Sequence, residues 1–140
     1  MKRTLFFIPV LFLILAIGCH LVTGPVENRG LFEMVYVDRM AAPDSAIVDT
    51  PVTVTVWGNL PDPSWDFDHF ELYFETRSLT VGVFGKKSDV EAVAAQVLVP
   101  FEKDLSFTPE RVETLIIRVI GKNDTLSTTL TVLPSKTGNP

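Results

Sequence analysis

The side chains that could carry out chemistry in this chain of 140 residues are few and dispersed. There is one cysteine, Cys19, and there are two histidines, His20 and His69. A zinc site needs three or four His, Cys or carboxylate ligands held together, and nucleophilic catalysis needs a nucleophile, a base and a group that orients the base. The spacing assembles neither set. We therefore expect no enzyme activity, no metal and no cofactor, and we interpret His69 as an exposed residue.

The densest group of charged side chains is an acidic cluster in the middle of the chain. It comprises Asp62, Asp66, Asp68, Glu71 and Glu75. Hard oxygen ligands at the end of a β-sandwich can bind calcium, although this spacing is not that of an EF-hand loop. Two interpretations stay open: a solvated acidic loop and strand face, or a calcium-dependent adhesion or carbohydrate-binding site.

Three aromatic residues are candidates for an interface. Trp57 and Tyr73 lie opposite the apolar faces of their predicted strands, and Trp65 lies in a segment rich in turn residues. Exposed aromatic side chains are enriched at protein interfaces. The alternative is that Trp57 and Tyr73 pack beneath a neighbouring loop or that the second sheet face is also buried.

The N-terminal segment has the plan of a secretory signal peptide. The short positive start Met1–Arg3 precedes an unbroken apolar run, Leu5–Ile17. Such a run is too short for a transmembrane helix, which needs about 20 residues, and small residues follow it as they do at a cleavage site. We expect residues 1–18 to be removed and the protein to leave the cytoplasm.

The string Leu15-Ala16-Ile17-Gly18-Cys19 resembles the lipobox of bacterial lipoproteins. The resemblance implies cleavage between Gly18 and Cys19 and attachment of lipid to Cys19, which would hold the protein on a membrane because two or more acyl chains anchor stably. It also implies the outer membrane if the organism is Gram-negative, since His20 stands where Asp would retain the protein at the inner membrane. The alternative is ordinary signal-peptidase cleavage after Ala16-x-Gly18, which leaves Cys19 as a free thiol.

Composition limits what the mature domain can bind and how it can be stabilised. The chain has 12 basic and 17 acidic residues, and removal of Lys2 and Arg3 leaves a net charge of −7. An acidic surface argues against nucleic acid and against electrostatic binding to anionic lipid. With its only cysteine at the cleavage site, the domain can form no internal disulfide and must depend on its hydrophobic core.

Alternating apolar and polar residues predict a domain of β-strands over residues 31–133, between a flexible tether at 19–30 and a disordered tail at 134–140. Val52, Val54 and Val56 share one face of the clearest strand, and this period of two marks a half-buried strand. Gly58–Pro63 predicts a turn, and Gly85–Ala95 is either a short helix or a loop. The predicted strands are Leu31–Val37, Pro51–Trp57, Asp68–Glu75, Leu79–Phe84, Gln96–Phe101 with Leu105–Phe107, Thr114–Ile120 and Leu126–Val132.

Seven or eight short strands with turn signals between them predict an all-β antiparallel sandwich. The run from Ala42 to Val132 resembles the immunoglobulin-like domains of bacterial envelope proteins, through APDSAIVDTPVTVTV and LSFTPERVETLIIRVIGKNDTLSTTLTVLP. The sequence lacks the cysteine pair of antibody domains, and Arg111, Val112 and Glu113 stand where their tyrosine precedes the penultimate strand. The fold is shared by many unrelated functions. We expect a lipid-anchored, non-catalytic binding or assembly module with a protein partner in the cell envelope.

Overall fold

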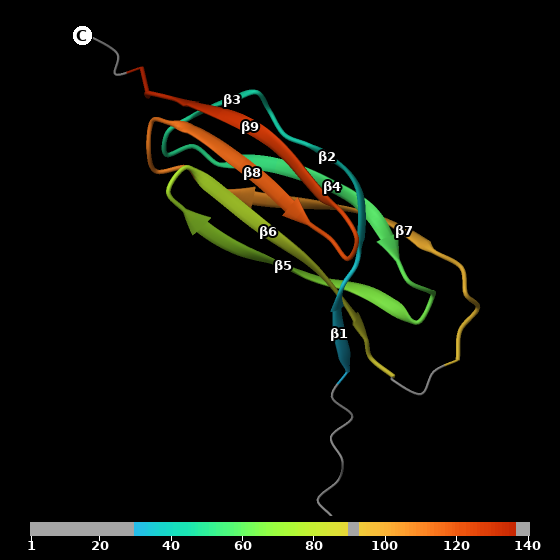
Figure 1. Ribbon diagram of the computed structural model, residues 1–140. Coiled ribbons are helices and arrows are strands. Elements are labelled where there is room, and N and C mark those ends of the chain that lie inside the picture. The colour runs from blue at the N-terminus through green and yellow to red at the C-terminus, as the bar shows by residue number, and fades with distance from the viewer. Residues whose placement is uncertain (1–29, 90–92, 137–140) are drawn as a thin grey trace, which may run out of the picture.

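The computed structural model describes residues 30–89 and 93–136, which form two packed β-sheets (Figure 1). These residues contain nine strands and no helix. The prediction of an all-β fold is confirmed. The strands are β1 (Leu31–Met34), β2 (Tyr36–Ala41), β3 (Ser45–Ile47), β4 (Val52–Leu60), β5 (Trp65–Glu75), β6 (Ser78–Lys87), β7 (Val99–Phe107), β8 (Thr114–Ile120) and β9 (Thr125–Leu133).

The larger sheet, which we call sheet A, has six strands, and the smaller, sheet B, has three in the order β2-β4-β7. In sheet A, β5 and β6 form a hairpin, and two strands share the other edge of β6. Residues 78–82 of β6 pair in parallel with β8, and residues 84–87 pair antiparallel with β1. β9 and then the short β3 complete sheet A, with β3 parallel to β9.

Val35 is the point at which the chain passes from sheet A to sheet B. Its N–H donates to the carbonyl oxygen of Val83 at 3.0 Å, and its own carbonyl accepts from the N–H of Lys122 at 2.8 Å. The Val35 side chain is fully buried. Both backbone groups are therefore satisfied while β1 extends sheet A and β2 enters sheet B.

The core lies between the sheets and is built from the predicted inward faces. Val52, Val54 and Val56 of β4 are buried, and they face the apolar side of sheet A. On β8 the alternation places Leu115, Ile117 and Val119 inward, as predicted. Apolar burial on both inner faces, rather than any disulfide, holds the described domain together.

The structure corrects the predicted turn at Gly58–Pro63. β4 continues through Gly58 to the buried Leu60, and only residues 61–64 form the turn. Gly58 is buried where a Cβ atom would lie 2.0 Å from the carbonyl oxygen of Tyr36 and 2.7 Å from the ring of Phe101. Glycine here permits a close approach of strands and does not break one.

The strand order bears on the immunoglobulin-like assignment, which stays a prediction. In immunoglobulin domains the third main strand lies beside the penultimate one, whereas here β6 lies between β5 and β8. β6 and β8 pair in parallel because the chain crosses to sheet B as β7 before it returns. Of the uncertain segment Gly85–Ala95, residues 85–87 belong to β6, residues 88–89 and 93–95 form no helix, and residues 90–92 lie outside the description.

Candidate functional site

Trp57 lies on the outer face of sheet B and is half-buried. The guanidinium carbon of Arg39 lies 4.1 Å from the centre of its ring, and Arg39 and Glu102 flank it on the two neighbouring strands. This cation–π contact holds Arg39 over the ring and hides part of the aromatic surface. Trp57 is thus covered by a charged side chain and not presented as an open aromatic patch.

Tyr73 lies on the outer face of sheet A, on the opposite side of the sandwich from Trp57. Its side chain is 51% exposed, and its hydroxyl hydrogen-bonds to Glu71, which raises the pKa of Tyr73 above its ordinary value. Elsewhere on this face the rings of His69 and Phe84 stack with centroids 5.2 Å apart. Of the two alternatives for Tyr73, the structure has the exposed one, but it does not bring Tyr73 together with Trp57.

The prediction that Trp65 is exposed in a loop is wrong. Trp65 begins β5 opposite Lys87, and its side chain is only 7% exposed within the core. A turn does precede Trp65, but this turn ends at Ser64. The Trp65 N–H donates to the carbonyl of Asp62 at 3.1 Å, which closes the turn directly onto the strand.

Four of the five acidic residues between Asp62 and Glu75 have separate local partners, and for Glu71 the partner is the Tyr73 hydroxyl. Asp62 accepts hydrogen bonds from the hydroxyl and the N–H of Ser64, which lower the pKa of its carboxyl group. Asp68 pairs with Nδ1 of His69 at 2.5 Å, and Glu75 accepts from the Ser78 hydroxyl at 3.3 Å. Over residues 30–89 and 93–136, no three His, Cys, Asp or Glu side chains converge as a metal site would require.

A groove of about 620 Å³ lies at one end of the sandwich. Its floor is apolar and consists of the buried side chains of Phe107, Pro109, Leu115 and Val132. Its rim carries Phe74, which is 61% exposed, and four charged residues: Glu75, Glu110, Arg111 and Glu113. The rings of Phe74 and Phe107 lie 6.3 Å apart, so the aromatic surface continues from the floor to the rim. An apolar floor with a few polar groups is typical of a binding site.

Hydrogen bonds fix the segment 108–113 that forms one wall of this groove. The N–H of Asp49 donates to the carbonyl of Pro109 at 2.9 Å, and the N–H of Val132 donates to that of Glu113 at 2.8 Å. Asp49 adopts a left-handed φ of 60° to make its bond. Non-glycine residues accept this conformation where the surrounding structure imposes it. The wall is thus tied to the core at both ends.

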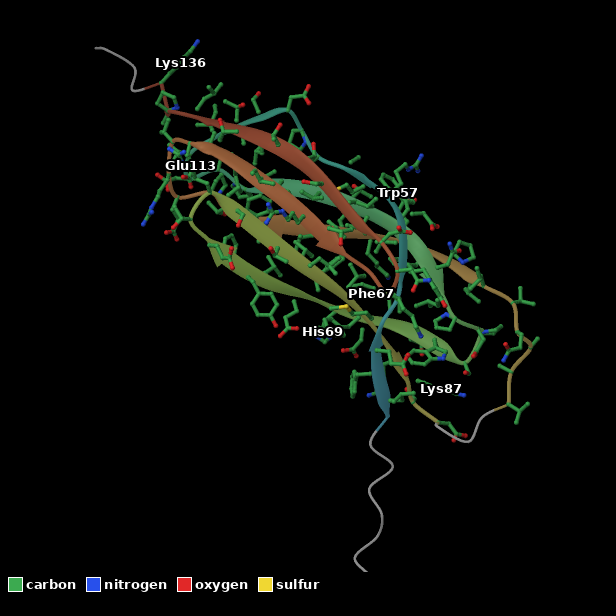
Figure 2. The ribbon with its side chains drawn as sticks, in the orientation of Figure 1. Trp57, Phe67, His69, Lys87, Glu113 and Lys136 are labelled. Carbon is green, nitrogen blue, oxygen red and sulfur yellow. The ribbon has the colours of Figure 1, made fainter. Side chains whose placement is uncertain are left out.

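The groove lies far from the place where the chain enters the domain. Its Phe74 and Glu75 adjoin the start of β6, whereas Leu31 at the chain entry pairs with Lys87 at the end of β6. The ten residues of β6 span about 30 Å. Figure 2 shows Glu113 and Lys87 towards opposite ends of the sandwich.

Sequence reasoning missed the groove because its residues are brought together only by the fold. Phe74 alternates along β5 with the partly buried Phe70 and Leu72, and its ring lies 6.3 Å from that of Phe107. It remains exposed because β5 is an edge strand and Phe74 is close to its end. A phenylalanine directly before a hairpin turn was the one available signal.

Comparisons with known proteins identify no relative. No protein-family model matches the chain, and no significant match was found among curated proteins or solved structures. Gly18 and Cys19 lie outside the described residues. Among those that are described, the chain forms no helix with the length and apolar character to span a membrane.

Proposed function

We propose that this protein is a lipid-anchored, non-catalytic binding module of the cell envelope, held on a membrane through Cys19. The observation that carries the proposal is the position of the groove. It opens at the end of the sandwich opposite Gly30, where the chain arrives from Cys19. A tether at one end and a binding groove at the other place the groove where it can reach a partner away from the membrane.

The chemistry of the groove favours a polypeptide partner. Phe74, Phe107 and Leu115 offer an apolar surface for a side chain of the partner. Glu75, Glu110 and Glu113 outnumber Arg111, so the rim carries net negative charge. Aromatic anchors ringed by polar groups are the usual centres of binding energy in protein interfaces. We propose a partner segment with a large apolar side chain beside a basic one.

The experiment is site-specific photo-crosslinking in the native envelope. A photoreactive phenylalanine analogue replaces Phe74, and in a matched control it replaces Thr129, an exposed residue on the outer face of sheet A. The proposal predicts a discrete protein adduct from position 74 and none from position 129. The charged rim, which includes Arg111 and Glu113, offers a further check. Glu113→Lys should weaken that adduct because it replaces a negative charge of the rim with a positive one. Equal labelling from both positions, or none from position 74, contradicts the groove as the binding site.

A further inference from the structure

Large apolar side chains are exposed at the end of the sandwich where the chain enters. We define this tether-end surface by five residues: Leu31, Phe32, Val93, Val97 and Leu98. Their exposed fractions are 40%, 50%, 100%, 60% and 54%. They make up half of the ten large hydrophobic residues exposed in the described part of the chain. Exposed apolar side chains gathered at one end of a domain are a feature of surfaces that contact a membrane or another protein.

Register shows that these residues belong to one end of the fold. Leu31 pairs with Lys87 at the end of β6, and Val99, which follows Leu98, pairs with Leu60 at the end of β4. The segment that contains Val93, Val97 and Leu98 thus connects two strand ends on this side of the molecule. Figure 1 shows β1 at the lower end of the view, away from the turn between β5 and β6.

Charge at this end is balanced. Lys86 lies opposite Asp66 on the neighbouring strand, and its ammonium nitrogen is 5.4 Å from the centre of the Phe32 ring. Asp62 lies close enough to Lys87 for the lysine to contribute to lowering the pKa of its carboxyl group. Both described lysines at this end thus lie near acidic side chains, so we expect apolar contact, and not attraction to anionic lipid, to drive any association with a membrane.

We infer that the tether-end surface docks on the bilayer surface and inserts its apolar side chains at the boundary between headgroups and acyl chains. The inference rests on the proposed anchor at Cys19. Ten residues lie between Cys19 and Gly30, so the chain can hold this surface at most about 40 Å from the lipid. Such confinement raises the local lipid concentration and lets a surface too weak to bind alone remain docked. Docking this end turns the groove away from the membrane.

The test uses the mature lipidated protein in phosphatidylcholine vesicles that carry a nitroxide quencher in the acyl region. A fluorescent probe is attached through Gln96→Cys, beside Val97, or through Val112→Cys as control. Val112 is an exposed aliphatic residue in the groove wall segment at the other end. Because lipidation consumes the Cys19 thiol, each engineered cysteine is the only one that reacts. Flotation of the vesicles reports the anchor independently of the probe.

We expect the probe at position 96 to shift to shorter wavelength and lose emission to the quencher, and the probe at position 112 to do neither. High salt should leave the quenching unchanged. Adding Val97→Ser and Leu98→Ser should reduce the quenching at position 96 while the protein still floats. If the protein floats and the two positions behave alike, docking is refuted and the anchor stands. If the protein does not float with the vesicles, the anchor fails and the docking inference fails with it.

Discussion

At the scale of single residues, Gly58 shows how a backbone contact decides what a position tolerates. A Cβ atom there meets the carbonyl oxygen of Tyr36 at 2.0 Å, whereas at Gly82 it meets the edge of the Phe84 ring at 2.9 Å. The ring can rotate away, but the backbone of β2 cannot. Two glycines in neighbouring sheets are therefore expected to differ greatly in their tolerance of alanine.

We predict that Gly58→Ala lowers the free energy of unfolding by about 3 kcal/mol, the upper range for overpacking a core. Gly82→Ala should cost about 1 kcal/mol or less, because alanine also suits a strand better than glycine does. Urea unfolding of the two variants beside the wild type measures the difference. Equal stabilities of the two variants would show that β2 does not approach β4 at Gly58 as the structure has it.

Asp62 supports a prediction on pH. Its hydrogen bonds with Ser64 lower the pKa of the carboxyl group, so the ionised form is stabilised in the folded state. This contribution is present above the ordinary carboxyl pKa and is lost as the pH falls through the lowered value. Ser64→Ala should raise the pKa of Asp62 towards its ordinary value, as an NMR titration of the side chain would measure. Unfolding measured in parallel should show the stability gap between the two proteins closing on acidification. An unchanged Asp62 titration would contradict the turn geometry.

At the scale of elements, β8 is an interior strand of sheet A. It pairs with β6 on one side and β9 on the other, and its inward residues are buried. We predict that Ile117→Ala lowers the free energy of unfolding by about 3–4 kcal/mol through the cavity it leaves. Ile116→Ala, one residue away on the outer face, should cost about 1 kcal/mol. Denaturant unfolding of both variants measures these two losses of stability. Similar losses would contradict the assignment of Ile117 to the inner face and Ile116 to the outer face.

The acidic strand β5 gives a prediction about metal. Because Asp62, Asp68 and Glu75 each have a separate local partner, we expect the melting temperature to be the same with millimolar calcium and with chelator. A rise in melting temperature on adding calcium would favour the calcium-dependent adhesion or carbohydrate-binding interpretation. Asp68→Asn should then abolish that rise.

Strands with one buried face were predictable, because the alternation of apolar and polar residues along such a strand follows directly from the burial of one face. β4, β8 and β9 follow the expected pattern over the predicted ranges. Errors occur where tertiary contacts override local signals. Gly58 continues a strand because β2 approaches it, and Trp65 is buried because β5 starts immediately after a tight turn. The three-residue strand β3 (Ser45–Ile47) was missed because it exists only through its pairing with β9.

At the scale of the whole molecule, the two ends of the sandwich differ in kind. One end carries the chain entry and exposed apolar side chains, and the other carries a groove with an apolar floor and an acidic rim. The groove draws on residues 74–76, 107–111, 113, 115 and 132, which no local pattern links. Of the predicted interface residues, only Tyr73 is clearly exposed, and it lies beside a groove residue in the chain. The sequence could suggest aromatic contacts but could not locate them.

The difference between the two ends of the sandwich gives a prediction for the intact protein. We expect Cys19→Ser to release the protein from the membrane fraction without altering its fold, because Cys19 lies outside the described strands, of which the first begins at Leu31. Fractionation with detergent-phase partitioning measures the release, and circular dichroism of the purified variant checks the fold. Retention of the variant in the membrane fraction would mean that something other than lipid on Cys19 holds it there.

Mass spectrometry of the N-terminal peptide of the mature protein shows whether Cys19 carries lipid. We predict a peptide that begins at Cys19 and carries the mass of a diacylglycerol thioether, with or without an additional acyl chain on the amine. The Cys19→Ser protein should lack this peptide. A wild-type N-terminus at Cys19 with a free thiol would contradict the anchor and with it the proposed placement of the groove.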